Sequence, residues 1–165
     1  MVLAITAILA SIAVPPLSDA IARHRLRAAM TALVDTLQHA REAALYRTGG
    51  TFVCPSTNGR ICSGQTDWGI GWISRDRVTK DVLSVEDALD TRLTAFSMGT
   101  RTEITFLHPD KKEDVSPTNQ TLALCLHGKP ATTVTLVVAK SGHSHVEPAS
   151  PEVARACGAR HSRNR

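Results

Sequence analysis

The sequence predicts an α+β fold in which a long N-terminal helix packs on an antiparallel β-sheet body. Two observations lead to this fold: apolar residues recur with a helical period as far as Thr48, and strand-like runs replace that period after Gly50. The 165 residues suit one domain. A hydrophobic content of 42% with 21% charged residues excludes a disordered chain and a polytopic membrane protein.

Residues 1–16 form the first element, an apolar segment that predicts a membrane helix. No charge precedes Asp19, and 18 helical residues span roughly 27 Å, just short of the ~30 Å hydrocarbon core. A cleaved signal peptide is one alternative, because Ser11-Ile12-Ala13 resembles a cleavage site, although the usual positive n-region is missing. A buried core helix is another, although soluble helices are rarely apolar on every face. We favour membrane insertion.

Residues 17–48 are expected to form an amphipathic helix of roughly 48 Å. Its apolar stripe steps mostly by three and four residues and comprises Leu17, Ile21, Leu26, Met30, Leu33, Leu37, Ala40 and Ala44. Gly49-Gly50 ends the helix, since glycine readily adopts the left-handed conformation. Pro16 either begins this helix or kinks one continuous helix that starts at Met1. The arginines at 23, 25 and 27 either form a solvated face of this helix or contact lipid phosphates or neighbouring helices.

Residues 49–157 are expected to form a β-rich body, and residues 158–165 a basic C-terminal tail. Turn residues such as Asn58-Gly59 and Ser141-Gly142 separate short β-rich runs. These runs are 51–54, 71–74, 82–85, 93–96, 103–107, 121–125 and 132–138.

Four cysteines have a spacing that fits neither a Cys-x-x-Cys redox motif nor a zinc ribbon. An even count behind a membrane-type N-terminus favours an oxidising compartment and disulfides. Among the three pairings we favour Cys54 with Cys62, around the Asn58-Gly59 turn, and Cys125 with Cys157, which ties the tail to the sheet. Four reduced, buried cysteines are the alternative.

The formal charge of +4 is uneven along the chain. Residues 1–152 balance their charges, whereas residues 153–165 hold four arginines and no acid. A basic surface throughout is therefore excluded, and any affinity for a polyanion is local. The candidates for phosphate contact are Arg155, Arg160, Arg163 and Arg165, because arginine forms charge-assisted bonds to phosphate. A solvated chain end is the alternative.

His143 and His145 are two residues apart, so on a strand they face the same side. No cysteine or acidic ligand stands at metal spacing beside them, so we expect exposed histidines and no metal site. An anion site that strengthens below about pH 6.5 is the alternative. No nucleophile motif such as Gly-x-Ser-x-Gly occurs, so we expect neither catalytic residues nor a cofactor.

The order of these features resembles the FimT/GspH family of minor pseudopilins, and within it the FimT-like members of type IV pili. Residues 2–15 look like the later part of the pilin N-terminal helix, up to its proline. The most specific part is Cys54-Pro55-Ser56 with Gly59 and Cys62, followed by Asp67-Trp68-Gly69-Ile70-Gly71-Trp72-Ile73. It is similar to the family's Cys-Pro-Ser loop and Trp-x-x-Gly-Trp-Ile strand. The likeness is weakest between residues 76 and 119.

This resemblance implies a pilin-like fold and a non-enzymatic minor subunit that takes part in type IV pilus assembly. It implies an inner-membrane anchor with a periplasmic domain, and a place in the pilus beside other major and minor pilins. The helix positions concerned are Leu3, Ile5, Ile8, Leu9, Ile12 and Pro15. A minor pseudopilin of type II secretion is the alternative within the family, and a free periplasmic β-domain of unknown ligand is the alternative outside it.

Two features depart from the family pattern. The prepilin leader, its cleavage site and the glutamate near the start of the mature chain are absent. Either the true start lies upstream of Met1, which the short apolar span favours, or the product is not processed normally. Gly142-His143-Ser144-His145 stands where members often carry Gly-Arg-x-Arg, an element implicated in DNA binding. The resemblance thus implies non-specific DNA binding for natural transformation. We place it at the four C-terminal arginines, assisted by His143 and His145.

Overall fold

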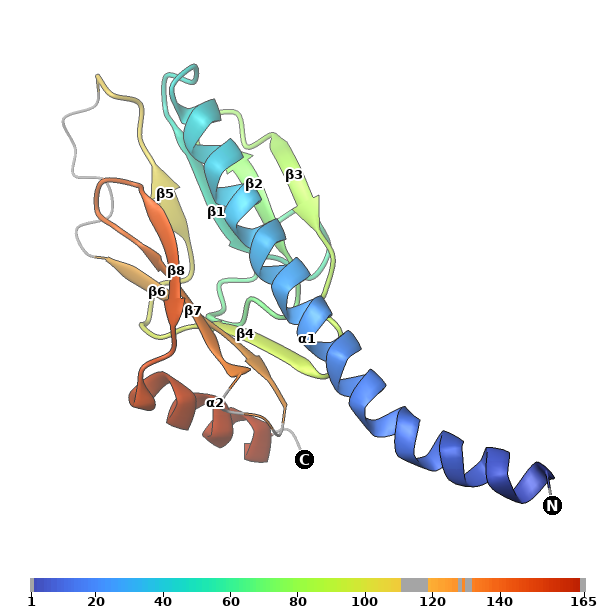
Figure 1. Ribbon diagram of the computed structural model, residues 1–165. Coiled ribbons are helices and arrows are strands. Elements are labelled where there is room, and N and C mark those ends of the chain that lie inside the picture. The colour runs from blue at the N-terminus through green and yellow to red at the C-terminus, as the bar shows by residue number, and fades with distance from the viewer. Residues whose placement is uncertain (1, 111–118, 128, 130–131, 164–165) are drawn as a thin grey trace.

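The computed structural model describes residues 2–110, 119–127, 129 and 132–163, with side chains from residue 18 to residue 160 of these ranges. Within them, helix α1 (Val2–Ala44) precedes eight strands and helix α2 (Pro151–Arg163). Figure 1 shows α1 crossing the body and continuing beyond it toward the N-terminus, with α2 along the lower end of the strands. The predicted α+β fold is confirmed.

α1 is a single helix of 43 residues. It runs through Pro15 and Pro16, so the continuous helix is adopted and no new helix begins at Pro16. The helix ends at Ala44, four residues earlier than expected, because its last turn tightens into i→i+3 hydrogen bonds donated by the amides of Leu45 and Tyr46.

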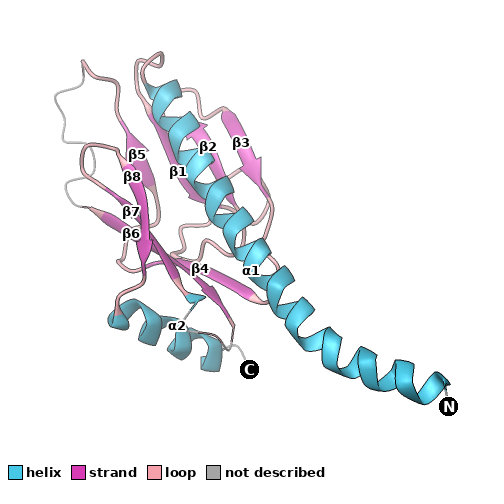
Figure 2. Cartoon of the chain, in the orientation of Figure 1, coloured by secondary structure: helices cyan, strands magenta, loops and turns pink. Residues whose placement is uncertain are grey.

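Two four-stranded antiparallel sheets form the body (Figure 2). The first sheet has the order β3-β2-β1-β5, with β1 Thr51–Pro55, β2 Trp72–Asp76, β3 Val82–Glu86 and β5 Ile104–Phe106. The second has the order β4-β6-β7-β8, with β4 Leu93–Ser97, β6 Gln120–Leu126, β7 Val134–Val138 and β8 Ser144–Pro148. Each predicted β-rich run overlaps one of these strands.

The main core lies between α1 and the inner faces of both sheets. Alternation along a strand sends every second side chain to one face. Val53 of β1 and Leu122 of β6 point this way and are fully buried. They meet Leu33 and Leu37 of α1, which are 0% and 1% exposed. The expected amphipathic helix is therefore present, and its apolar stripe is what joins the two sheets.

Each disulfide lies on the outer face of one sheet, away from α1. Cys54 of β1 is bonded to Cys62, with Cα atoms 5.6 Å apart, and this pair covers the first sheet. Cys125 of β6 is bonded to Cys157 of α2 across a Cα separation of 6.0 Å. These are the pairs favoured from the sequence. The second bond holds α2 on the outer face of the second sheet, where Val153 also packs.

Strand β8 and helix α2 lie outside the predicted set of elements. The start of α2 carried a recognisable signal: Ser150 accepts a hydrogen bond from the Val153 amide at 3.4 Å, Pro151 occupies the first helical position and Glu152 lies in the first turn. The boundary expected at residue 158 falls inside this helix. The basic segment as far as Arg163 is therefore part of a folded helix and not a frayed chain end.

Candidate functional site

α1 enters the body at Ala22. Among its described side chains, Ala22 is the first buried one, at 5% exposure, and buried positions then recur up to Ala44. Ile21, which the predicted stripe included, is 43% exposed. The reason is helical geometry. Ala22 lies four residues before Leu26 and shares its face of the helix, whereas Ile21 lies five residues before Leu26 and points to another face. The part of α1 before Ala22 extends beyond the sheets (Figure 1).

Two ion pairs fix α1 where it leaves the body. Arg25 pairs with Asp90, just before β4, and Asp19 pairs with Lys129, just after β6. The hydrogen bond from Lys129 lowers the pKa of the Asp19 carboxyl, and the Arg92 amide does the same for the pKa of Asp90. Both carboxylates are therefore charged at neutral pH, and each joins the helix to a different loop.

Buried hydrogen bonds continue this attachment along the helix. The indole Nε1 of Trp72 donates to Thr36 Oγ1 at 3.1 Å, and that hydroxyl donates to the carbonyl of Ala32 at 2.8 Å. Thr51 Oγ1 donates to the carbonyl of Ala40 at 2.6 Å. Because buried polar groups are costly when unpaired, these bonds set the register of α1 on the first sheet.

Asp76 holds the C-terminal end of α1 on the first sheet. Its buried carboxylate accepts from Arg47 Nη1 at 2.9 Å and from the amides of Val78 and Thr79 at 2.7 and 2.9 Å. The Arg47 hydrogen bond is the main cause that lowers the pKa of Asp76 from its ordinary 3.8. A charged Asp76 thus ties the end of α1 to the β2–β3 turn.

We expect Asp76→Asn to lower the free energy of unfolding by about 1.5–3 kcal/mol at pH 7, the range for hydrogen bonds to a charged group. Because the folded pKa lies below the unfolded one, the wild-type advantage is complete above about pH 4 and is lost as the pH falls through the folded value. Urea unfolding at pH 7 and pH 3 measures both. Asp35→Asn, at an exposed position of α1, is the control. Equal stabilities of Asp76→Asn and wild type at pH 7 would refute this role.

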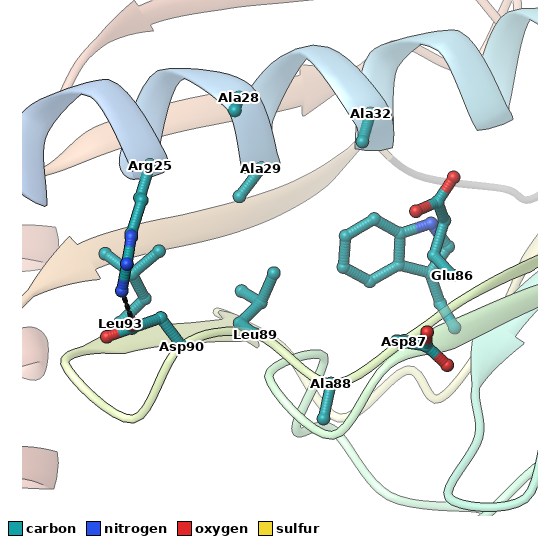
Figure 3. Close-up of a pocket in the computed structure, with 11 residues that line it drawn as sticks. Arg25, Ala28, Ala29, Ala32, Glu86, Asp87, Ala88, Leu89, Asp90 and Leu93 are labelled. Carbon is teal, nitrogen blue, oxygen red and sulfur yellow. Dashed lines mark hydrogen bonds and ion pairs between the residues drawn. The ribbon is translucent and has the colours of Figure 1, made fainter. Parts of the chain in front are cut away.

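A groove on one flank of α1 has an acidic wall; we call it the acidic groove (Figure 3). Its volume is about 360 Å³. α1 contributes Arg25, Ala28, Ala29 and Ala32, and the connection from β3 to β4 contributes residues 86–90. Figure 3 shows Arg25 reaching from α1 to Asp90 across the groove, which leaves Glu86 and Asp87 of this connection without an ion-pair partner among the described residues.

A second groove, of about 480 Å³, lies on the other flank of α1; we call it the basic groove. Its apolar lining comes from α1, β7 and β8, and includes Leu26, Met30, Val134 and Val146. Arg23 and Arg27 line the same groove, and within the described part of the chain neither lies in an ion pair with a carboxylate. Val146 is 48% exposed, so the groove is open to solvent.

The Trp-x-x-Gly-Trp-Ile segment connects the two sheets. The amides of Trp68 and Gly69 donate to the carbonyl of Ala95 in β4, at 2.8 and 3.0 Å, before the chain enters β2. Gly71 has φ +97°, and a Cβ there would lie 2.6 Å from the carbonyl oxygen of Glu86. Trp68 and Trp72 are at most 1% exposed. The two tryptophans are therefore packing anchors.

The residues predicted to bind DNA share one face but not one site. The register Thr121↔Val137↔His145 places His145 on the face of the second sheet that α2 covers. The rings of His143 and His145 are stacked 6.5 Å apart on the same side, as expected, and His145 Nε2 lies 3.8 Å from Glu147. β8 is five residues long and separates His143 from α2, a distance of roughly 16 Å along the strand.

The arginines of α2 have different surroundings. Arg155 is exposed and donates to the carbonyl of Pro151 at 3.3 Å. The guanidinium of Arg160 lies 4.1 Å from the centre of the Phe96 ring, on the edge strand opposite β8. Arg163 belongs to α2 but its side chain lies outside the described ones, as does all of Arg165. Arg155 is thus the most accessible of the described pair.

The remaining predictions concern the apolar segment and metals. The side chains expected to act in the membrane or in assembly lie outside the described ones, although their backbone belongs to α1; they are Leu3, Ile5, Ile8, Leu9, Ile12 and Pro15. No helix in the described residues has a stretch both apolar and long enough to cross a membrane. The described residues also contain no cluster of three or more His, Cys, Asp or Glu that could hold a metal ion.

Comparison with known proteins gives a consistent picture. The family model described as type II transport protein GspH matches residues 29–142. The fold is similar to two crystal structures of the type IV minor pilin FimU of Pseudomonas aeruginosa (strain PAO1). In space group P21 the identity is 24% and the TM-score 0.61, over 76% of this chain and 90% of that one. In space group P65 the identity is 23% and the TM-score 0.58, over 74% of this chain and 92% of that one.

No curated protein matches the chain significantly. The family match spans well over half of the chain, and it includes the Cys-Pro-Ser and Trp-x-x-Gly-Trp-Ile segments that carried the resemblance in the sequence. The structural likeness adds the fold, with one long helix and two antiparallel sheets. The chain belongs to the FimT/GspH family of minor pilins and pseudopilins, as its sequence indicated.

Proposed function

We propose that the protein is a minor subunit of a type IV pilus and joins the fibre through α1. The observation that carries this proposal is the shape of the helix. From the Asp19–Lys129 ion pair onward α1 is attached to the body, whereas the 17 residues before it (2–18), roughly 26 Å of helix, lead away from the sheets toward the N-terminus (Figure 1). This segment is apolar, so it is suited to lipid or to a bundle of similar helices, and unsuited to water.

In this proposal the inner membrane holds the apolar segment before assembly, and other major and minor pilins hold it afterwards. The body then faces the periplasm and, in the fibre, the outside. Two disulfides are in keeping with an oxidising compartment of this kind. The role is structural, and it requires no catalytic group.

Deletion of the gene tests the proposal in the host organism. We expect the deleted strain to lose surface fibres and to regain them when the full chain is supplied. We also expect the protein to be present in fibres sheared from the wild type. The proposal would be contradicted if the deleted strain made normal fibres and if the protein were missing from wild-type fibres.

A pseudopilin of a type II secretion system is the second candidate, favoured by the description of the matched family as a type II transport protein. The same deletion separates the two. Loss of secreted proteins with fibres intact identifies the secretion system, and loss of fibres with secretion intact identifies the pilus.

We propose DNA capture for natural transformation as an added role of the outer face of the second sheet. The observation in its favour is that α2 carries arginines and no acid after Glu152, on the same face as His143 and His145. Because the two groups lie at different ends of β8, they would act as two contact points for one duplex and not as one pocket.

Four phosphate contacts predict a slope near −3.6 when the logarithm of the DNA association constant is plotted against the logarithm of the salt concentration. We expect the quadruple variant with alanine at the C-terminal arginines (155, 160, 163 and 165) to flatten this slope to near zero. His143→Ala/His145→Ala is expected to weaken binding at pH 6 more than at pH 7.5, since histidine gains its charge in this range. Fluorescence anisotropy with a labelled duplex measures both. An unchanged slope in the quadruple variant would remove α2 from the site.

A further inference from the structure

The grooves on the two flanks of α1 carry opposite charges. The basic groove presents Arg23 and Arg27 over an apolar lining, and the acidic groove presents Glu86 and Asp87 on its wall. Arg25, which lies between the two arginines in sequence, is already paired with Asp90. Among the described residues, Arg27, Glu86 and Asp87 lie in no ion pair, and the charge of Arg23 acts on Asp19, which is itself paired with Lys129. These charged groups are therefore available to a partner.

Helical geometry places these surfaces on opposite sides of the chain. The α1 residues of the acidic groove centre on Arg25 and Ala32, and those of the basic groove on Arg23 and Arg27. At 100° per residue the two sets point in directions about 170–180° apart. A contact between the basic flank of one copy and the acidic flank of another is thus heterologous, and it leaves a free flank at each end.

Both surfaces have a fixed shape before any contact. The acidic connection is held by the Leu89 amide, which donates to the carbonyl of Gly69 at 2.9 Å, and by the ion pair of Asp90 with Arg25. At its tip the small apolar side chain of Ala88 is exposed between the acidic residues and Leu89. In the basic groove, Arg23 and Arg27 project from one face of a rigid helix, beside the exposed Val146. Little ordering is needed to join the two.

We propose that the connection from β3 to β4 of one copy docks into the basic groove of a second copy, with Glu86 and Asp87 facing Arg23 and Arg27. Ala88 then lies on the apolar lining beside Val146. The inference rests on the proposed function, in which the body packs beside other subunits of the fibre, and it names a second copy of this chain as one such neighbour. Because this contact is heterologous, it can repeat from copy to copy.

Charge exchange tests this contact on the full chain in detergent micelles, with a labelled copy titrated by an unlabelled one. We expect Arg23→Glu/Arg27→Glu to weaken self-association about tenfold, and Glu86→Lys/Asp87→Lys to do the same, since each puts like charges face to face. A mixture of the two variants restores opposite charges at every contact, so we expect it to associate as tightly as wild type. The matched control, Arg60→Glu/Lys80→Glu, changes the charge by the same amount on the outer face of the first sheet and leaves association unchanged.

Three outcomes overturn the inference: variants that self-associate like wild type, a mixture that does not recover, or a control that weakens equally. Circular dichroism and thermal unfolding of each variant show that the fold is intact. The presence of the charge variants in sheared fibres is a separate readout. If the charge variants enter fibres normally and also self-associate like wild type, the proposed contact is refuted and the proposed function is not.

Discussion

Replacing Cys125 and Cys157 by serine is expected to lower the free energy of unfolding by about 3–4 kcal/mol, because the bond closes a loop with a sequence separation of 32. The bond also holds α2 on the second sheet, where Val153 and the Arg160–Phe96 contact are among its other attachments. We therefore expect α2 to detach at a lower denaturant concentration than the rest of the chain, and hydrogen exchange of its amides to show this.

The other disulfide provides the comparison. Cys54–Cys62 closes a loop with a sequence separation of 8, so serine at both positions is expected to cost less, about 2–3 kcal/mol. Urea unfolding of both variants beside wild type measures the difference. A larger cost for the shorter loop would contradict the loop-closure account, and no cost at either site would mean that the bonds have no part in stability.

A charge in the apolar segment of α1 is expected to have the second large effect. Lysine near the middle of a membrane helix costs about 2.5–3.5 kcal/mol on insertion, so Ile8→Lys is expected to reduce the inserted fraction about 100-fold. Ile8→Leu keeps the apolar character and is the control. Membrane fractionation of both variants, followed by quantification in sheared fibres, gives the result. Normal fractionation of Ile8→Lys would refute the anchoring role.

The helix and the strands could be predicted because their side-chain periods are strong. Leu33 and Leu37 fit a helical stripe, and each β-rich run overlaps a strand. α2 was not predicted because its arginines, with no acid after Glu152, suggested a basic chain end, although Ser150 with Pro151 was a recognisable start signal. Ile21 was misplaced because a step of five residues was accepted in a stripe that the helix does not continue.

The grooves beside α1 could not be predicted, because they depend on how loops distant in sequence reach the helix. The arginines at 23, 25 and 27 look alike in the sequence, yet Arg25 is paired with Asp90, 65 residues later, while the other two line the basic groove. Asp76 likewise became important through a contact with Arg47, 29 residues away. Long-range pairs of this kind leave no local signal in the residues that make them.

The central proposal is that α1 carries the subunit into a fibre with other pilins. Quantitative mass spectrometry of fibres sheared from the host tests this most directly, with wild type, Ile8→Leu and Ile8→Lys each supplied to the deleted strain. We predict that the wild type and the leucine variant are present in the fibres and that the lysine variant is missing. Complete fibres that lack the wild-type protein, while it remains in the cell, would contradict the account.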